Sequence, residues 1–141
     1  MSRSNSVASR KPSSAYSTCM TACEACVLAC GDCTLHLRAN AALEPRLLHD
    51  VGVCMQVCEL ALRAMSGDGA LVPAACAASA RCCEALASRC MLMPEPEYMR
   101  CARACYRAAQ ECMRVAQSRG SAVPHPLRLT GTGGGARLTA R

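Results

Sequence analysis

The sequence predicts an all-α protein: an antiparallel, up-down-up-down four-helix bundle with a Cys-lined core. The 141-residue chain has 14 cysteines, three tyrosines and neither phenylalanine nor tryptophan, so thiols must fill much of the interior. Breaks rich in proline and glycine leave four long segments, about 16–43, 46–66, 73–92 and 96–119. Their Ala, Leu, Arg, Glu and Met content favours helix. Short connections make neighbouring helices antiparallel.

Length and charge divide the chain into one domain and two ends. We expect residues 1–14 to be a disordered arm, 15–119 a single helical domain, and 120–141 a disordered basic tail rich in Gly and Pro. The net charge of +6 arises in the two ends, because residues 16–119 hold ten Arg against ten Asp or Glu. A nucleic-acid-binding face on the folded domain is therefore disfavoured, and we expect no nucleic-acid partner.

The first segment carries five cysteines at alternating spacings of four and three residues. This is heptad spacing, and it places all five thiols on the face that meets the other helices. The five are Cys19, Cys23, Cys26, Cys30 and Cys33. In the second segment, Cys54 and Cys58 occupy the middle of a similar stripe, and aliphatic residues occupy its ends.

The third and fourth segments repeat this register. Their inward positions hold Cys76, Cys83, Cys90, Cys101, Cys105 and Cys112. Thirteen of the fourteen cysteines are thus predicted to face the interior, and only Cys82, about 100° around its helix from Cys83, falls outside the pattern.

Two interpretations without a metal remain open. Buried cysteine can pack as a small hydrophobe, although it forgoes the larger apolar burial of Leu or Phe. Thiols at i and i+4 project in parallel and are poorly placed for disulfides, whereas bridges between helices remain possible. A thiol-redox or disulfide-stabilised helical module is therefore the alternative function. No Ser-His-Asp or Cys-His-Asn set can be placed and the acidic residues look exterior, so we expect no enzyme activity.

Metal binding is the function that the single-faced thiols favour. Iron-sulfur ligands come largely from loops, and structural zinc needs discrete sets of four ligands, whereas these thiols form a continuous line on helices. Cu(I) is soft and accepts two or three thiolates. Each Cu⁺ that replaces a thiol proton also leaves the charge of the core unchanged. We therefore expect multiple Cu(I) ions, held for storage rather than catalysis.

Targeting signals are not evident. The first eighteen residues are polar and contain no apolar run typical of an export signal, and no later stretch reaches about 18 uninterrupted apolar residues. We expect a cytoplasmic protein with reduced thiols and no membrane partner.

These motifs resemble the four-helix-bundle copper storage proteins of bacteria over about residues 16–119. The resemblance rests on C-x3-C-x2-C-x3-C-x2-C from Cys19, C-x3-C from Cys54, the heptad-spaced cysteines of the third segment, and C-x3-C from Cys101 followed by Cys112. It implies a thiol-lined interior that stores many Cu(I) ions, and a homo-oligomer, specifically a tetramer. Ser79, Leu86 and Ala108 depart from the pattern, which implies a lower capacity and gaps near these residues.

The resemblance also implies an entrance lined by His and Met at one end of the bundle. The antiparallel order brings His36, His49, Met91, Met93 and Met99 to the same end. His36 could be a ligand or a surface residue, and the helical angle of His49 favours the surface. Met91 and Met93 could be thioether ligands or hydrophobic plugs. Cys82, His36, Met91 and Met93 are therefore the possible additional ligands.

Overall fold

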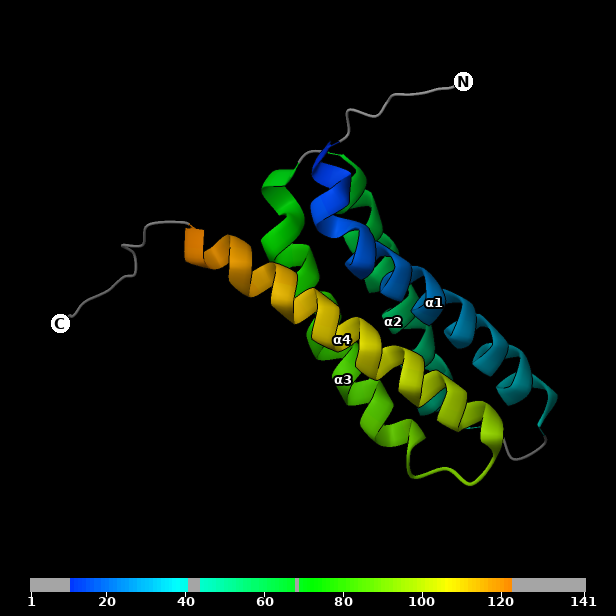
Figure 1. Cartoon of the computed structure of the whole chain (residues 1–141). Coiled ribbons are helices and arrows are strands. Elements are labelled where there is room, and N and C mark those ends of the chain that lie inside the picture. The colour runs from blue at the N-terminus through cyan, green and yellow to red at the C-terminus, as the bar shows by residue number, and fades with distance from the viewer. Residues whose placement is uncertain (1–10, 41–43, 68, 123–141) are drawn as a thin grey trace, which may run out of the picture.

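The structure is a computed structural model that describes residues 11–40, 44–67 and 69–122. It is all-α, as predicted: four long helices and one short 3-10 helix, with no strand among the described residues (Figure 1). The elements are α1 (Lys11–Ala39), α2 (Pro45–Ser66), η1 (Gly69–Leu71), α3 (Val72–Cys90) and α4 (Pro96–Ala122).

Prolines determine where three of the helices begin. Pro45 and Pro73 lie in the first turns of α2 and α3, and Pro96 is the first residue of α4. A proline fits there because its fixed φ is helical and the missing N–H has no partner in the first turn. Pro94 limits α3 at the other end, since the residue before a proline avoids helical geometry.

Two helices extend past a predicted boundary, and α1 also ends at Ala39, before the predicted boundary at about 43. α1 begins at Lys11, inside the segment expected to be a disordered arm, because Pro12 is compatible with a first turn and no breaker follows it. α4 continues to Ala122, because a single Gly120 costs only about 1 kcal/mol in a helix. The remainder of the predicted arm, 1–10, and of the predicted tail, 123–141, lies outside the described residues.

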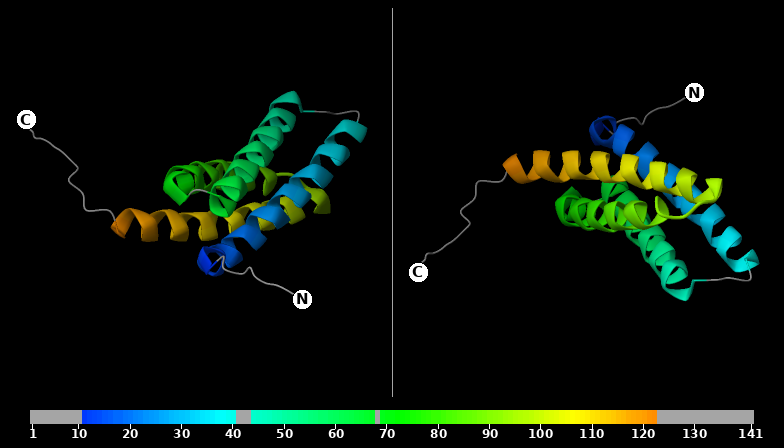
Figure 2. Two further views of the ribbon diagram at one scale, coloured as in Figure 1. Left: turned by 90° about the horizontal axis from the view of Figure 1, so that it is seen from above. Right: turned by 90° about the horizontal axis from the view of Figure 1, so that it is seen from below.

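The helices pack as two antiparallel hairpins. α1 packs against α2 and α4, and α3 packs against α4 and α2, so that each helix has two neighbours around a common axis. Seen from above and from below, the α1–α2 hairpin runs obliquely across the α3–α4 hairpin (Figure 2). This is the predicted up-down-up-down bundle.

Apolar side chains close both ends of the core. Tyr16, Met65 and Val72 are buried where α1 begins, α2 ends and α3 begins. Leu37, Leu47 and Tyr98 are buried at the opposite end. Between these two caps, cysteines and alanines supply most of the buried side chains.

Two stretches, Ala15–Ala39 and Gly69–Cys90, are long and apolar enough to cross a membrane by length and composition. In the bundle, 33% and 44% of their most apolar windows are buried. Both carry stripes of cysteines that face the other helices, and a core helix of a bundle has this composition. The outward side of α1 nevertheless carries two large apolar side chains, since Leu28 is 72% exposed and Leu35 is 69% exposed.

Candidate metal centre

Thirteen thiols line the axis of the bundle, as the heptad register predicts. Each of these cysteines is at most 1% exposed, and all fourteen cysteines of the chain are free thiols. The structure therefore contains no disulfide of the kind that a disulfide-stabilised module would need. Cys82 is only half-buried and lies outside the line, which confirms that it is the exception.

The thiols cluster into four groups in which all Sγ atoms lie within 4.8 Å of one another. The groups are Cys26, Cys30, Cys54 and Cys105; Cys26, Cys54, Cys58 and Cys83; Cys19, Cys76 and Cys112; and Cys33, Cys90 and Cys101. Cys23 adjoins the third group, because its Sγ lies 3.4 Å from that of Cys112. Every one of the thirteen thiols therefore has another thiol within ligand-sharing distance.

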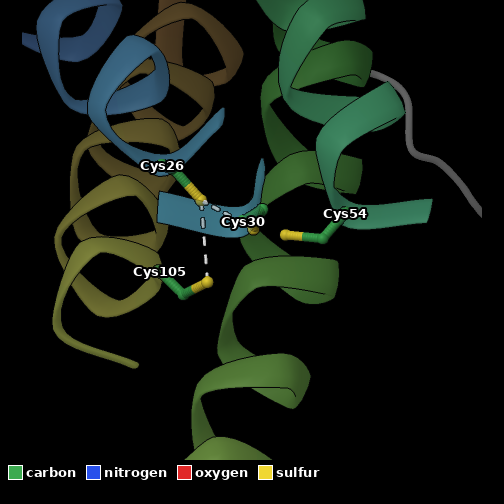
Figure 3. Close-up of side chains that lie close together, drawn as sticks. All are labelled: Cys26, Cys30, Cys54 and Cys105. Carbon is green, nitrogen blue, oxygen red and sulfur yellow. Dashed lines mark hydrogen bonds between the residues drawn. The ribbon is translucent and has the colours of Figure 1, made fainter. Parts of the chain in front are cut away.

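The two central groups share Cys26, from the middle of α1, and Cys54, from α2. The Sγ of Cys26 lies 3.6 Å from Cys105 Sγ on α4 (Figure 3). It also lies 3.8 Å from Cys83 Sγ on α3, so one thiol contacts both helices. Cys54 on α2 points at the same space. Three thiolates that bind one ion at about 2.3 Å in a plane lie about 4 Å apart. The sulfurs are thus already near the separation that a shared metal requires.

The two end groups take thiols from three helices only. α2 contributes none, because its inward residues on either side of Cys54 and Cys58 are Val51 and Ala61, both fully buried. The centre of the bundle therefore offers four-thiol groups, and each end offers three thiols close together. This distribution follows from the thiol centre and aliphatic ends of the α2 stripe.

Hydrogen bonds among the thiols make their acidities unequal. Hydrogen bonding to Cys101, then to Cys33, together with burial, raises the pKa of Cys90 far above its ordinary value. Hydrogen bonding to Cys101 and burial raise the pKa of Cys33 to about 12. Hydrogen bonds from neighbouring thiols, Cys105 first, lower the pKa of Cys101. One thiolate forms readily in such a group, and its neighbours then keep their protons until a cation replaces them.

The three predicted departures from the thiol pattern are all buried. Ser79 is fully buried, and its Oγ lies 3.4 Å from Cys58 Sγ and 3.8 Å from Cys83 Sγ. Ala108 on α4 is also fully buried, and Leu86 on α3 is 2% exposed. A hydroxyl and two apolar side chains therefore take core positions where the register would allow sulfur.

The predicted entrance residues differ in their surroundings. His36 is half-buried: its ring meets Tyr98 edge-on at 5.2 Å, and its Nδ1 lies 3.9 Å from Glu97 Oε1. Its Nε2 is buried and has no hydrogen-bond partner among the residues that the structure describes. His49 is exposed, as its helical angle predicts.

The methionines at this end separate into two kinds. Met91 is 49% exposed just beyond α3, so it does not act as a plug. Met93 is partly buried and packs against the core. Met99, the remaining member of the predicted set, is half-buried on α4.

Cys82 lies in a shallow recess between α2 and α3 rather than on the axis. Asp50, Val53, Leu86 and Arg89 line this recess with it, and Arg89 pairs with Asp50. Burial raises the pKa of the Cys82 thiol. The possible ligand at Cys82 is therefore separate from the four thiol groups.

Two polar features were not found from the sequence. Glu97 and Tyr98 meet His36 because the turn between α3 and α4 determines how far α4 slides along α1, and no sequence pattern encodes that offset. Glu111 is buried, contrary to the expectation that the acidic residues are exterior. Arg114 Nη1 donates to its Oε1 at 2.6 Å, which explains how a carboxylate is tolerated there.

Comparison with known proteins agrees with this geometry. The family model for copper storage proteins matches residues 7–117. Apo copper storage protein 3 from Bacillus subtilis superposes with a TM-score of 0.66 at 28% identity, over 72% of this chain and 98% of that chain. The Cu(I)-bound form of the same Bacillus protein gives a TM-score of 0.69 at 28% identity, over 75% of this chain and 99% of that one. No curated protein matches the sequence. The chain belongs to the copper storage protein family.

Proposed function

We propose that this protein stores Cu(I), binding many ions through the thirteen thiolates that line its axis and so protecting the cell from free copper. The observation that carries the proposal is the line of fully buried thiols, which group within 4.8 Å of one another inside a bundle of the copper storage family. Storage follows from the number of groups, because a catalytic centre needs one site whereas this axis offers four.

The chemistry of the core selects a soft monovalent ion. Thiolates prefer soft ions, and the described interior offers no imidazole or carboxylate among the four thiol groups. Each Cu⁺ displaces one thiol proton, so the core stays neutral as it fills. A divalent ion at one per thiol would leave a positive charge at every site, in an interior with no solvent to screen it.

Anaerobic titration tests the proposal. The reduced protein, titrated with Cu(I) against a competing chelator, should take up roughly ten or more ions, in the order of one per axial thiol. Saturation at one to four ions would contradict storage. The Cys82→Ser variant is the matched control, because its sulfur lies outside the four groups and its loss should leave the capacity unchanged.

Counting free thiols distinguishes copper storage from the alternative, a thiol-redox or disulfide-stabilised module. Protein isolated from cells and denatured anaerobically should show near fourteen free thiols if the thiols serve a metal. A count near zero would favour bridges between helices instead.

We also propose that ions enter at the end that carries His36. The buried Nε2 of His36, which lies on α1 three residues after Cys33 and has no hydrogen-bond partner among the described residues, supports this, because an imidazole nitrogen there can hold an ion briefly before thiolates take it. His36→Ala should slow stopped-flow uptake of Cu(I) and leave the final capacity unchanged. His49→Ala, on an exposed side chain at the same end, is the control and should change neither the rate of uptake nor the capacity. Equal rates in both variants would refute the role of His36.

We propose further that the protein is cytoplasmic and self-associates, as the resemblance to tetrameric family members implies. The outward face of α1 supports self-association, because Leu28 and Leu35 lie one heptad apart and remain largely exposed. Replacing both with glutamate should reduce the mass measured by light scattering without changing copper capacity. A fractionation assay of the native cells tests the compartment.

A further inference from the structure

The thiols along the axis form two sets, which meet at Cys23 and Cys58. Sγ–Sγ contacts of at most 4.0 Å connect seven of them: Cys26, Cys30, Cys54, Cys58, Cys83, Cys101 and Cys105. Cys33 and Cys90 join this set through Cys101. The other set is Cys19, Cys23, Cys76 and Cys112. We call them the nine-thiol set and the four-thiol set.

One layer of the bundle lies between the two sets. On α3, Ser79 stands between Cys76 of the four-thiol set and Cys83 of the nine-thiol set. On α4, Ala108 stands between Cys112 and Cys105 in the same way. Because α3 and α4 are antiparallel, and Cys76 meets Cys112, Ser79 and Ala108 lie at the same level. Two of the predicted departures from the thiol pattern, Ser79 and Ala108, therefore lie in the same layer of the bundle.

The other two helices supply the only sulfurs of this layer. Cys58 on α2 lies 3.4 Å from Ser79 Oγ. Cys23 on α1 has thiol neighbours on both sides of the layer, because Cys112 and Cys19, and then Cys58, raise the pKa of its thiol. We call Cys23, Cys58, Ser79 and Ala108 the Ser79 layer. Both of its thiols already have partners elsewhere: Cys23 lies 3.4 Å from Cys112, and Cys58 lies 3.4 Å from Cys83.

An ion in the Ser79 layer would therefore have too few sulfur ligands. A hydroxyl oxygen is a hard donor that Cu(I) disfavours, and the alanine methyl donates nothing. The ion would have to share Cys23 and Cys58 with ions on either side, whereas the neighbouring groups offer three or four thiols each. The Ser79 hydroxyl can instead donate a hydrogen bond to the Cys58 thiolate. This hydrogen bond occupies the sulfur lone pair that would bind a metal ion in the other groups.

We propose that Ser79 divides the stored copper into two separate pools, one held by the nine-thiol set and one by the four-thiol set. This inference rests on the proposed storage function and adds a specificity-determining residue to it. Copper in each pool binds and leaves with its own kinetics, and the Ser79 layer stays without an ion.

The first experiment measures capacity in three variants by anaerobic Cu(I) titration. Ser79→Cys places a third sulfur in the layer and should bind about one more ion than the native protein. Ala80→Cys is the matched control: Ala80 is buried next to Ser79 but lines the groove between α3 and α4, so its sulfur lies off the axis and should add none. Ser79→Ala should leave capacity unchanged. Equal capacities for Ser79→Cys and the native protein would overturn the proposal.

The second experiment follows release of Cu(I) from the fully loaded protein into excess chelator. The native protein should release copper in two phases with amplitudes near nine to four, following the thiols in each set. Cys112→Ala should reduce only the smaller phase and Cys101→Ala only the larger, and Ser79→Cys should merge the two. A single phase in the native protein, or loss from both phases in each variant, would refute the division.

Failure of the storage function and failure of the division at Ser79 give different titration and release results. If the native protein binds four ions or fewer, the storage function itself is wrong. If it binds ten or more and releases them in one phase, storage stands and the division at Ser79 is wrong.

Discussion

Raising the pH should unfold the copper-free protein and leave the copper-loaded protein folded. The ordinary pKa of a thiol is 9.0, and hydrogen bonding and burial raise the pKa of Cys33 to about 12 and those of Cys76 and Cys90 further. Above pH 9 the unfolded chain loses these protons and the native chain keeps them. The stability that these thiols contribute is therefore complete below about pH 9 and is lost as the pH rises towards the folded-state pKa values.

The magnitude follows from the number of retained protons. Each one costs about 1.4 kcal/mol of unfolding free energy per pH unit, so Cys33, Cys76 and Cys90 alone cost about 4 kcal/mol per unit. The five other buried thiols with raised pKa values add to this loss; they are Cys23, Cys26, Cys30, Cys83 and Cys105. Between pH 9 and 11 the loss from the first three alone is about 8 kcal/mol, which is comparable with the whole stability of a small domain. In the loaded protein copper has already replaced the protons, so this loss disappears.

Urea unfolding followed by far-UV circular dichroism measures the effect, under anaerobic conditions with reductant, from pH 7 to 11. Both forms contain the same tyrosines and arginines, so the loaded protein controls for every other titrating group. An unfolding free energy of the copper-free protein that stays level between pH 9 and 11, or falls equally in both forms, would refute the reasoning.

Three further predictions concern single residues. Cys26→Ala removes one of the two thiols that both central groups share and should lower capacity by about two ions in the chelator titration, whereas removing Cys82 costs none. Tyr98→Ala opens the cap of the core and should cost about 3–5 kcal/mol in urea unfolding of the copper-free protein, whereas Tyr98→Phe keeps the ring and costs far less. Gly52→Ala should stabilise α2 by roughly 0.5–1 kcal/mol, because a Cβ there meets no atom within 4 Å; a loss of stability would contradict this.

The fold and the inward direction of the thiols could be predicted because both depend on local rules. Heptad spacing in α1 determines which way Cys19 and Cys33 face, whatever the rest of the chain does. Prolines such as Pro45 and Pro96 mark where helices begin, because their missing N–H is tolerated only in a first turn. The sequence therefore sufficed for the four helices and for the exception at Cys82.

Features that depend on the relative sliding of helices could not be predicted. The sequence identifies Ser79 and Ala108 as separate departures, but their common level follows from how α3 and α4 pack. The contact of His36 with Glu97 depends in the same way on the turn before α4. The burial of Glu111 depends on Arg114, one turn away, whose guanidinium neutralises it.

The two tyrosines that cap the core give the protein an optical reporter at each end. Tyr16 lies at the end of the four-thiol set and Tyr98 at the end of the Cys33–Cys90–Cys101 group, whereas Tyr106 is exposed on α4 and the chain has no tryptophan. Tyrosine emission is therefore not masked by indole emission. Replacing Tyr106 and one buried tyrosine with phenylalanine would leave a single fluorophore, so that the arrival of copper at each end could be timed separately in an otherwise unlabelled protein.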